Sequence, residues 1–379
     1  MNINLAPTFT KPLGEVFVLW YEVSNTYSII APEFQLLLES YLKSESESEF
    51  FSTLSNEISA SEASNIFETL QHYLLNCNTP NTEEIFPLIK PDHYQRNISK
   101  VYNFNGRTIK VYFDSAPVIN LIHPALEHFT TNKIDEAVVA TFDIYLKNDD
   151  LYLLKDDELI ACVPKRKYHL IQGKFIMHLL CALHNKQESD WIGTFHGSTI
   201  TDGNSSIMFV GKSGKGKSTL CTLLASQGFR LLADDVSPML SKDQHIYYNP
   251  SAISIKEGAF NLLKPIIDDF NQLPLIRFNK AKGNLKYVPC ARPEKYHYPC
   301  DVIILVNFTP QSETQLERVS VKTILETLIP DSWLSPNPFH AQQFLEWLSQ
   351  LKLYKLTYSD TNSVTSEISK LFKEGNIKV

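Results

Sequence analysis

A glycine-rich stretch in the second half of the chain has the residue types and spacing needed to hold a phosphate group. The segment GKSGKGKS, residues 211–218, fits the complete pattern G-x-x-x-x-G-K-[ST]. Glycines let backbone N–H groups turn inward around phosphate oxygens, and a helix that begins near Lys217 points the positive end of its dipole at the same anion. The lysine reaches the β- and γ-phosphates, and the Ser218 hydroxyl is a ligand for Mg²⁺. The residues predicted to bind the nucleotide are Gly211, Ser213, Gly214, Lys215, Gly216, Lys217, Ser218 and Thr219.

The elements that must position this loop are also indicated by the sequence. An apolar run at residues 207–210 predicts a strand before the loop. Leu220, Leu223 and Leu224 follow at helical spacing, and Gly228 supplies the C-terminal stop of the helix. A glycine-rich turn without a ligand is the alternative, and the strand–loop–helix context argues against it.

Two adjacent carboxylates follow the next apolar run. Residues 229–233 predict a second strand that ends in Asp234 and Asp235. The carboxyl end of a strand beside a phosphate loop is where open α/β sheets bind ligands. One carboxylate can hold Mg²⁺ while the other takes the proton of an attacking hydroxyl. We assign the proton to Asp234 and the metal to Asp235 with Ser218, although the two aspartates can exchange these roles, and a solvated strand end is the alternative.

Three blocks of this region together resemble the HPr kinase/phosphorylase family, whose kinase domain is related to phosphoenolpyruvate carboxykinase. They are His196-Gly197, the segment GKSGKGKS, and GFRLLADD close behind it. The resemblance covers roughly the last half of the chain and is nearest to family members that carry an N-terminal extension. It implies an active-site role for His196 on the strand next to the loop, near the γ-phosphate. Without the resemblance, a single histidine on a strand is more often a core residue.

The sequence departs from that family in one stretch. Residues 248–258, YNPSAISIKEG, match the region where the family has Glu-Ile-Arg-Gly. Ser254 stands in place of the glutamate and Lys256 in place of the arginine, with Glu257 one step on. The departure puts the family's reverse phosphorolysis in doubt. Lys256 can still neutralise phosphate charge, so it is kept as a candidate catalytic residue.

Length and composition exclude several classes of protein. The 379 residues suffice for two or three domains, and 43% hydrophobic with 20% charged residues is ordinary for a soluble protein. A net charge of −7 argues against a general nucleic-acid binder. We find no apolar stretch of the length that spans a bilayer and no signal peptide, so we expect a cytoplasmic protein. Neither a zinc site nor a disulfide framework is indicated by the six cysteines, most of which we expect to be buried thiols: Cys77, Cys162, Cys181, Cys221, Cys290 and Cys300.

The N-terminal region predicts a small unit of a hairpin and three helices. Its strands are expected at residues 15–23 and 27–30, and its helices at 32–42, 47–58 and 61–75, with Ser59 and Ser61 as N-caps. The order of elements resembles the winged-helix PqqD-like modules, which bind a leader peptide by strand addition to a sheet edge. A scaffold or dimerisation unit is the alternative. Residues 78–91 are proline-rich and read as a linker.

The middle of the chain is expected to be rich in β-structure. Asn105-Gly106 predicts a hairpin turn, and the remaining expected elements are a helix at 118–129, strands at 138–146, 151–154 and 159–163, and a helix at 172–183. None of the histidines in this section lies in a zinc-type H-x₃₋₅-H frame with a cysteine pair, so we reject a metal site formed by His123, His128, His169, His178 and His184.

The C-terminal region completes an α/β domain. Residues 193–200 and 207–210 predict a hairpin that leads into the loop, residues 301–306 a core strand, and residues 353–358 a late strand. Helices are expected at 319–328, 341–351 and 363–372. A basic run predicts a loop that is either solvated or a flap that faces an anion or a peptide: Arg277, Lys280, Lys282, Lys286, Arg292 and Lys295. The expected fold class is α/β (α+β overall), with domains at 1–90, 91–190 and 191–379.

The leading hypothesis is an ATP-dependent kinase with ATP and Mg²⁺ as cofactors. The expected acceptor is a hydroxyl, in particular a serine of a peptide or small protein such as a ribosomally made precursor peptide. Lys217 and Lys256 would stabilise charge on the transferred group. The alternative is a nucleotide-gated binding module without phosphotransfer, and a transport ATPase is disfavoured because no Leu-Ser-Gly-Gly-Gln segment occurs. We expect neither nucleic acid nor a membrane as partner, and the resemblance leaves a homo-oligomer open.

Overall fold

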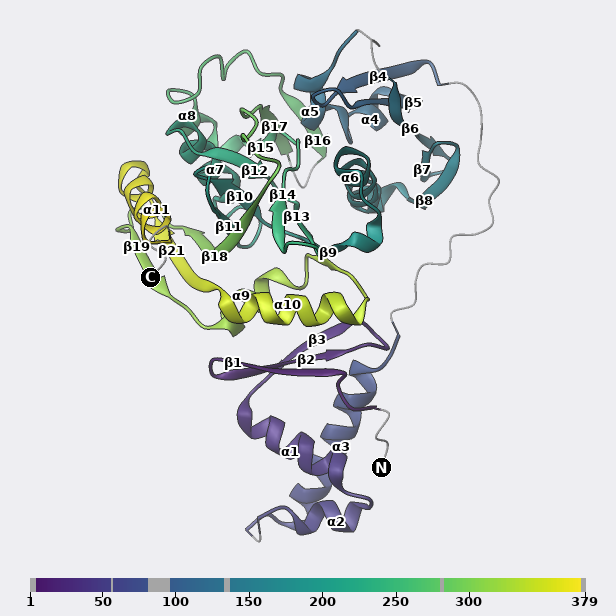
Figure 1. The fold of residues 1–379 in the computed structure, drawn as a ribbon, viewed down its shortest axis with the longest axis vertical. Coiled ribbons are helices and arrows are strands. Elements are labelled where there is room, and N and C mark those ends of the chain that lie inside the picture. Colours follow the sequence, from purple (N-terminus) through teal and green to yellow (C-terminus); the bar gives the residue numbers. More distant parts are fainter. Residues whose placement is uncertain (1–4, 56, 81–95, 133–136, 280–282, 376–379) are drawn as a thin grey trace.

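A computed structural model describes residues 5–55, 57–80, 96–132, 137–279 and 283–375. These residues form 11 α-helices and four β-sheets, so the α/β class is confirmed, whereas the division into three domains stays a prediction. Figure 1 shows the N-terminal unit below a larger body that holds the other three sheets. Among the described residues, none of the helices has the length and apolar character that a membrane span requires. Five of the six cysteines are buried, as predicted.

The N-terminal unit has a three-stranded antiparallel sheet in the order β1-β2-β3. Its elements are β1 (Phe9–Leu13), β2 (Val16–Tyr21), β3 (Thr26–Ile30), α1 (Pro32–Lys43), α2 (Glu47–Ser52) and α3 (Ala60–Cys77). The predicted hairpin and three helices are confirmed, while β1 was not predicted. Ser59 caps α3 in a reciprocal capping box with Glu62, whereas Ser61 lies inside the first turn and does not cap it. The linker prediction falls mostly on residues 81–95, outside the described residues.

Both faces of this small sheet are buried. On one face, Leu19 and Tyr21 pack in a core with α1 and α3. On the other, Val18 and Trp20 belong to the same core as α10 (Pro338–Gln350). Figure 1 shows the sheet between the N-terminal helices and α10. The unit is therefore joined to the C-terminal region by a shared hydrophobic core.

A five-stranded sheet in the order β4-β5-β6-β7-β8 forms the middle of the chain. Its elements are β4 (Ile98–Asn103), β5 (Thr108–Phe113), α4 (Ala116–Ile119), α5 (His123–Leu126), β6 (Val138–Lys147), β7 (Asp150–Lys155), β8 (Glu158–Pro164) and α6 (Tyr168–His184). The turn at Asn105-Gly106 is confirmed, with φ of 57° and 91°. The single helix predicted at 118–129 is wrong: short helical segments stand there, because Pro124 has no N–H to donate and its ring crowds the preceding turn.

The C-terminal region is built on a ten-stranded sheet with the path β12-β10-β11-β18-β14-β13-β9-β20, extended by β21 and β19. The strands are β9 (Trp191–Phe195), β10 (Ser198–Thr201), β11 (Ser206–Val210), β12 (Arg230–Ala233), β13 (Ser237–Leu240), β14 (His245–Tyr247), β18 (His297–Phe308), β19 (Gln315–Arg318), β20 (Trp333–Leu334) and β21 (Lys352–Tyr358). The helices are α7 (Lys217–Ser226), α9 (Val321–Leu328), α10 and α11 (Thr361–Gly375).

The 12-residue strand β18 lies at the centre of this sheet. It runs parallel to β11 and β21 and antiparallel to β14, which pairs with its first residues. Alternate residues pack on opposite faces: Ile303 with α9 and α10, and Ile304 with α7 and α11. The core strand and the helices predicted from the sequence are confirmed here.

Part of the basic run lies on strands rather than in the predicted loop: Arg277 and Lys286 are on strands, whereas Arg292 and Lys295 lie in a loop. β15 (Ile253–Lys256), β17 (Gly283–Val288) and β16 (Ile276–Asn279) make a small sheet in that order, next to α8 (Phe260–Leu263). Lys286 is buried, and its Nζ donates to the carbonyl oxygens of Phe270 and Asn271 at 2.7 and 3.1 Å. The loop prediction is wrong at this residue, since its charge is satisfied by the protein itself. Lys280 and Lys282 lie outside the described residues.

Candidate active site

The glycine-rich loop predicted to bind phosphate, residues 211–216 and called the phosphate loop below, lies between β11 and α7 in the predicted strand–loop–helix context. Gly211, Ser213, Gly214, Lys215 and Gly216 are in the loop, and Lys217, Ser218 and Thr219 form the first turn of the helix. Gly216 has a φ of 96°, and a Cβ there would lie 2.7 Å from the Tyr358 hydroxyl. A Cβ on Gly211 would lie 2.9 Å from the carbonyl oxygen of Val306. The fold therefore excludes side chains at both ends of the loop.

The loop is tied to the ends of two central strands. The Phe308 N–H of β18 donates to the Lys215 carbonyl at 3.1 Å, and the Tyr358 hydroxyl of β21 donates to the Gly216 carbonyl at 3.2 Å. Lys217 is only 8% exposed, and its Nζ donates to the Gly211 carbonyl. Burial lowers the pKa of this lysine, an effect that nearby carboxylates oppose. The ammonium is thus held inside the loop, where a phosphate would be a favourable partner.

Asp234 is a buried carboxylate at the end of β12, with 3% of its surface exposed. It accepts hydrogen bonds from Ser198 Oγ at 2.6 Å, from Ser218 Oγ at 3.1 Å and from the Ser254 N–H at 3.1 Å. Burial raises the pKa of Asp234 to about 6, and Asp235 adds to the effect, while the three hydrogen bonds oppose it. This carboxylate is therefore fixed against the first turn of the loop helix.

Asp235 has the opposite environment although it is the next residue. Its side chain is 61% exposed, and its Oδ1 lies 3.3 Å from His196 Nδ1. Its backbone is left-handed, with φ at 64°, a conformation that glycine, asparagine and aspartate adopt more readily than other residues. The turn at Asp235 directs its carboxylate away from Asp234 and toward the histidine.

His196 lies in a two-residue break between β9 and β10, rather than on a strand as predicted. The backbone N–H of His196 donates to Oγ of Ser332, which lies just before β20, at 3.0 Å. The structure brings His196 to Asp235 through a bend in the chain, a contact that the sequence analysis did not predict.

The pairing of Ser218 with Asp235 that we predicted is not what the structure shows. Ser218 contacts Asp234, and Asp235 faces outward beside His196. A carboxylate that touches the loop hydroxyl is the one able to share a metal ion with it. The metal and proton roles assigned from the sequence are therefore reversed in the function proposed below.

The strand β15 closes a third side of the site. Lys256 Nζ donates to Ser213 Oγ in the phosphate loop at 2.8 Å, although the lysine is largely exposed. Ser254, in the place of the family's glutamate, reaches Asp234 through its backbone N–H. Tyr287 lies on β17, which pairs with β15. Burial raises the pKa of Tyr287 to about 12, and Asp235 and Asp234 add to the effect. Sequence reasoning missed Tyr287 and Ser198, for which strand alternation was the only available signal.

The residues present fit a magnesium nucleotide. The Ser218 hydroxyl and the Asp234 carboxylate offer the oxygen ligands that Mg²⁺ prefers. The glycine positions leave the loop backbone free of side chains, and the buried Lys217 ammonium is adjacent. A separate cavity of about 580 Å³, lined in part by Phe104, His184 and Tyr296, involves none of these groups.

Among known proteins, the chain has a weak similarity to solved structures. No protein-family model matches the chain, and no curated protein is significantly similar to it. Solved structures do match, among them the structure of the Hpr(Ser) kinase/phosphatase from Coxiella burnetii. That structure is 12% identical, with a TM-score of 0.24, and the match covers 48% of this chain and 90% of the other. A TM-score this low does not assign a function, so the proposal below rests on the geometry of the site.

Proposed function

We propose that the chain is an ATP-dependent kinase that transfers the γ-phosphate to a hydroxyl, with a serine of a peptide or small protein as the acceptor. The observation that carries the proposal is the pair of carboxylates beside the phosphate loop: Asp234 is buried against Ser218, and Asp235 is exposed beside His196. A nucleotide sensor needs only the first carboxylate, because it holds the metal. Phosphoryl transfer also needs a base that faces the acceptor.

Each group at the loop has a defined task in this proposal. Lys217 and the loop N–H groups bind the phosphates, while Ser218 and Asp234 hold Mg²⁺. When bound, Mg²⁺ neutralises charge on the β- and γ-phosphate oxygens. The Ser198 and Ser254 hydrogen bonds keep Asp234 in place.

Asp235 is the proposed general base. It takes the proton of the acceptor hydroxyl as that oxygen bonds to the γ-phosphorus. The bond from the γ-phosphorus to the β–γ bridging oxygen breaks, and ADP leaves with the electron pair. His196, 3.3 Å from the Asp235 carboxylate, orients it toward the acceptor. Lys256, held over the loop by Ser213, stabilises charge on the transferred group.

We also propose that the N-terminal unit recognises the peptide acceptor. Within the described residues, the outer edges of β1 and β3 pair with no other strand. An extended peptide can add to such an edge through main-chain hydrogen bonds, and pockets along the edge then select its side chains. The unit would bind the leader part of the substrate and leave the acceptor serine free to reach Asp235.

The test is transfer of radiolabelled γ-phosphate from ATP to serine peptides encoded beside this gene. We expect label on the peptide with the wild-type chain and none with Lys217→Ala. Replacing the acceptor serine by alanine in the peptide is the matched control. Tight, Mg²⁺-dependent ATP binding without transfer to any of these peptides would overturn the kinase and favour a nucleotide sensor.

The role of the N-terminal unit is best tested by shortening the peptide rather than the protein. Deleting the unit would expose the apolar surface of α10 on which Trp20 and Tyr27 pack, so aggregation would obscure any effect on recognition. We expect a leaderless peptide to have a higher KM and a similar kcat. Equal KM values for full-length and leaderless peptides would exclude leader recognition.

A further inference from the structure

A second cluster of chemically capable side chains lies at the opposite end of β18 from the phosphate loop. Asp243, His245 and His297 each offer a ligand atom, and these atoms all lie within 4.8 Å of one another. His245 Nδ1 is 2.8 Å from His297 Nδ1, and His297 Nδ1 is 3.6 Å from Asp243 Oδ2. Since β18 has 12 residues, roughly 30–35 Å separates this cluster from the loop.

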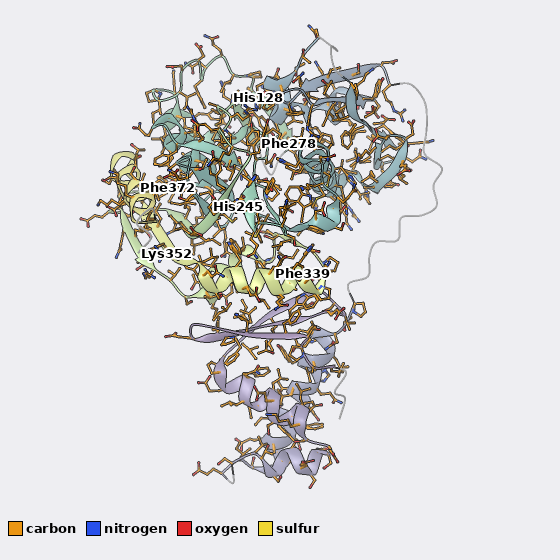
Figure 2. All side chains as sticks on the ribbon, viewed as in Figure 1. His128, His245, Phe278, Phe339, Lys352 and Phe372 are labelled. Carbon is orange, nitrogen blue, oxygen red and sulfur yellow. The ribbon has the colours of Figure 1, made fainter. Side chains whose placement is uncertain are left out.

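The backbone brings the three side chains to one face. β14 pairs antiparallel with the start of β18, with Tyr247 opposite His297 and His245 opposite Pro299. His245 and His297 are thus diagonal neighbours on the same side of the sheet. Asp243 lies two residues before β14. Its Oδ1 accepts a hydrogen bond from the backbone N–H of His245 at 3.1 Å. Figure 2 labels His245 in the central part of the larger body.

Tyr247 contacts two of the three residues, Asp243 and His297, and fixes their orientation. The Tyr247 hydroxyl donates to Asp243 Oδ2 at 2.8 Å. Its ring stacks on His297, with centroids 4.5 Å apart and planes inclined by 12°. Supporting contacts of this kind fix the orientation of metal ligands in proteins. The cluster is therefore already oriented by the fold around it.

We propose that Asp243, His245 and His297 form a binding site for a zinc-type transition-metal ion, separate from the magnesium site of the phosphate loop. Two imidazole nitrogens and one carboxylate oxygen are a ligand set that Zn²⁺ favours, whereas Mg²⁺ prefers oxygen alone. The two Nδ1 atoms face each other at hydrogen-bond distance, and a bound ion would replace that hydrogen bond with the nitrogens about 3.3 Å apart. Three protein ligands leave the fourth tetrahedral position for water. A bound ion would tie the β13–β14 connection to the start of β18.

The test is a zinc titration by calorimetry on the full-length protein, stripped with EDTA and returned to buffer with excess Mg²⁺. Co²⁺ absorption provides a second probe, because tetrahedral nitrogen and oxygen coordination gives a characteristic visible spectrum. We expect a single high-affinity site per chain. His297→Gln and Asp243→Asn should each abolish it, and Tyr247→Phe should weaken zinc binding by about 10- to 100-fold.

Two control variants separate this site from others that bind zinc. His72→Gln removes an exposed histidine of α3, and Asp235→Asn removes the carboxylate beside His196; both should retain zinc binding. Circular dichroism establishes that each variant is folded. Absence of zinc uptake by the wild-type chain would overturn the proposal. Unchanged zinc affinity and Co²⁺ spectrum in folded His297→Gln and Asp243→Asn variants would overturn it equally.

Discussion

The two ends of β18 differ in how their functional groups are assembled. At the C-terminal end, the phosphate loop is one contiguous segment, and the carboxylate pair follows one helix later. At the N-terminal end, His245 and His297 are 52 residues apart and meet only because β14 pairs with β18. A contiguous motif can be recognised in the sequence. A site made by strand pairing becomes visible only in the fold.

The two ends also differ in burial. Lys217 and Asp234 are 8% and 3% exposed, so their charges interact strongly with each other and with a bound ligand. The side chains of His297 and Asp243 are 41% and 25% exposed. We therefore expect substitutions at the C-terminal end of β18, the loop end, to change turnover and nucleotide binding strongly. Substitutions at the N-terminal end, the histidine end, should change metal binding alone.

The largest expected effect is on turnover at the loop end. Asp235→Asn should lower kcat by about 10²–10⁴ because a general base acts in the transition state. Nucleotide affinity, measured by calorimetry, should change little. Asp234→Asn should instead weaken Mg²⁺-dependent nucleotide binding, since that carboxylate contacts Ser218. The reverse pattern in the two variants would restore the roles predicted from the sequence.

The next effect concerns binding at the same end. Lys217→Ala removes a buried, charge-assisted contact and should weaken ATP binding by about 1.5–3 kcal/mol, or roughly 10- to 150-fold. Lys212→Ala, which alters an exposed lysine of the same loop, is the matched control and should have a much smaller effect. Equal ATP affinities for wild type and a folded Lys217→Ala variant would contradict the loop assignment.

A smaller effect is expected on the stability of the metal-free protein. The pKa of Asp234 is raised from 3.8 to about 6, so the folded state binds more protons than the unfolded state between about pH 4 and pH 6. The free energy of unfolding contributed by this group therefore falls as pH rises through that window, by about 1–3 kcal/mol. In EDTA, Asp234→Asn should remove this part of the pH dependence.

Urea unfolding at pH 4 and pH 7 measures the difference. The variant should gain stability relative to wild type as pH rises, in addition to a pH-independent loss because asparagine accepts the serine hydrogen bonds less well. Ser237→Ala serves as a control for loss of a nearby buried hydroxyl, which contacts Thr199 and Gly197 rather than Asp234. A parallel pH dependence in wild type and Asp234→Asn would refute the prediction.

The smallest expected effect tests whether the two ends are independent. His297→Gln should change ATP affinity by less than about 0.5 kcal/mol, because sites this far apart that share no contacts are usually energetically independent. Likewise, Lys217→Ala should leave zinc affinity unchanged. A larger cross effect in either calorimetric titration would show that β18 couples the two ends.

Sequence reasoning located the loop end well because its chemistry is local. The glycine spacing predicted the loop, apolar residues predicted the strand and helix on either side of it, and the two aspartates were placed beside them. Which aspartate contacts Ser218 could not be predicted, because it depends on the left-handed turn at Asp235. The contacts of Ser198 and Ser254 with Asp234 depend on strand register, which is not encoded in any short segment.

Elsewhere the successes and failures have the same cause. The Asn105-Gly106 turn and the Ser59 cap are local signals, and both are confirmed. The basic run was interpreted from charge alone, and Lys286 proved to be buried against the backbone carbonyls of Phe270 and Asn271, which belong to another segment of the chain. The expected metal frames required closely spaced histidines, so the pair His245 and His297 was not considered.

The burial of the N-terminal sheet on both faces has a geometric consequence for substrate choice. Its turn residue Asn25 donates to the Leu334 carbonyl at 2.8 Å, two residues beyond the serine that accepts the His196 N–H. A unit held in this way cannot swing toward the loop as a tethered arm would. A peptide bound along its edge must therefore bridge a fixed span to Asp235, at no more than about 3.3–3.6 Å per residue. The fixed distance would select acceptor serines by the number of residues that separate them from the bound leader, as well as by the residues next to them in the peptide.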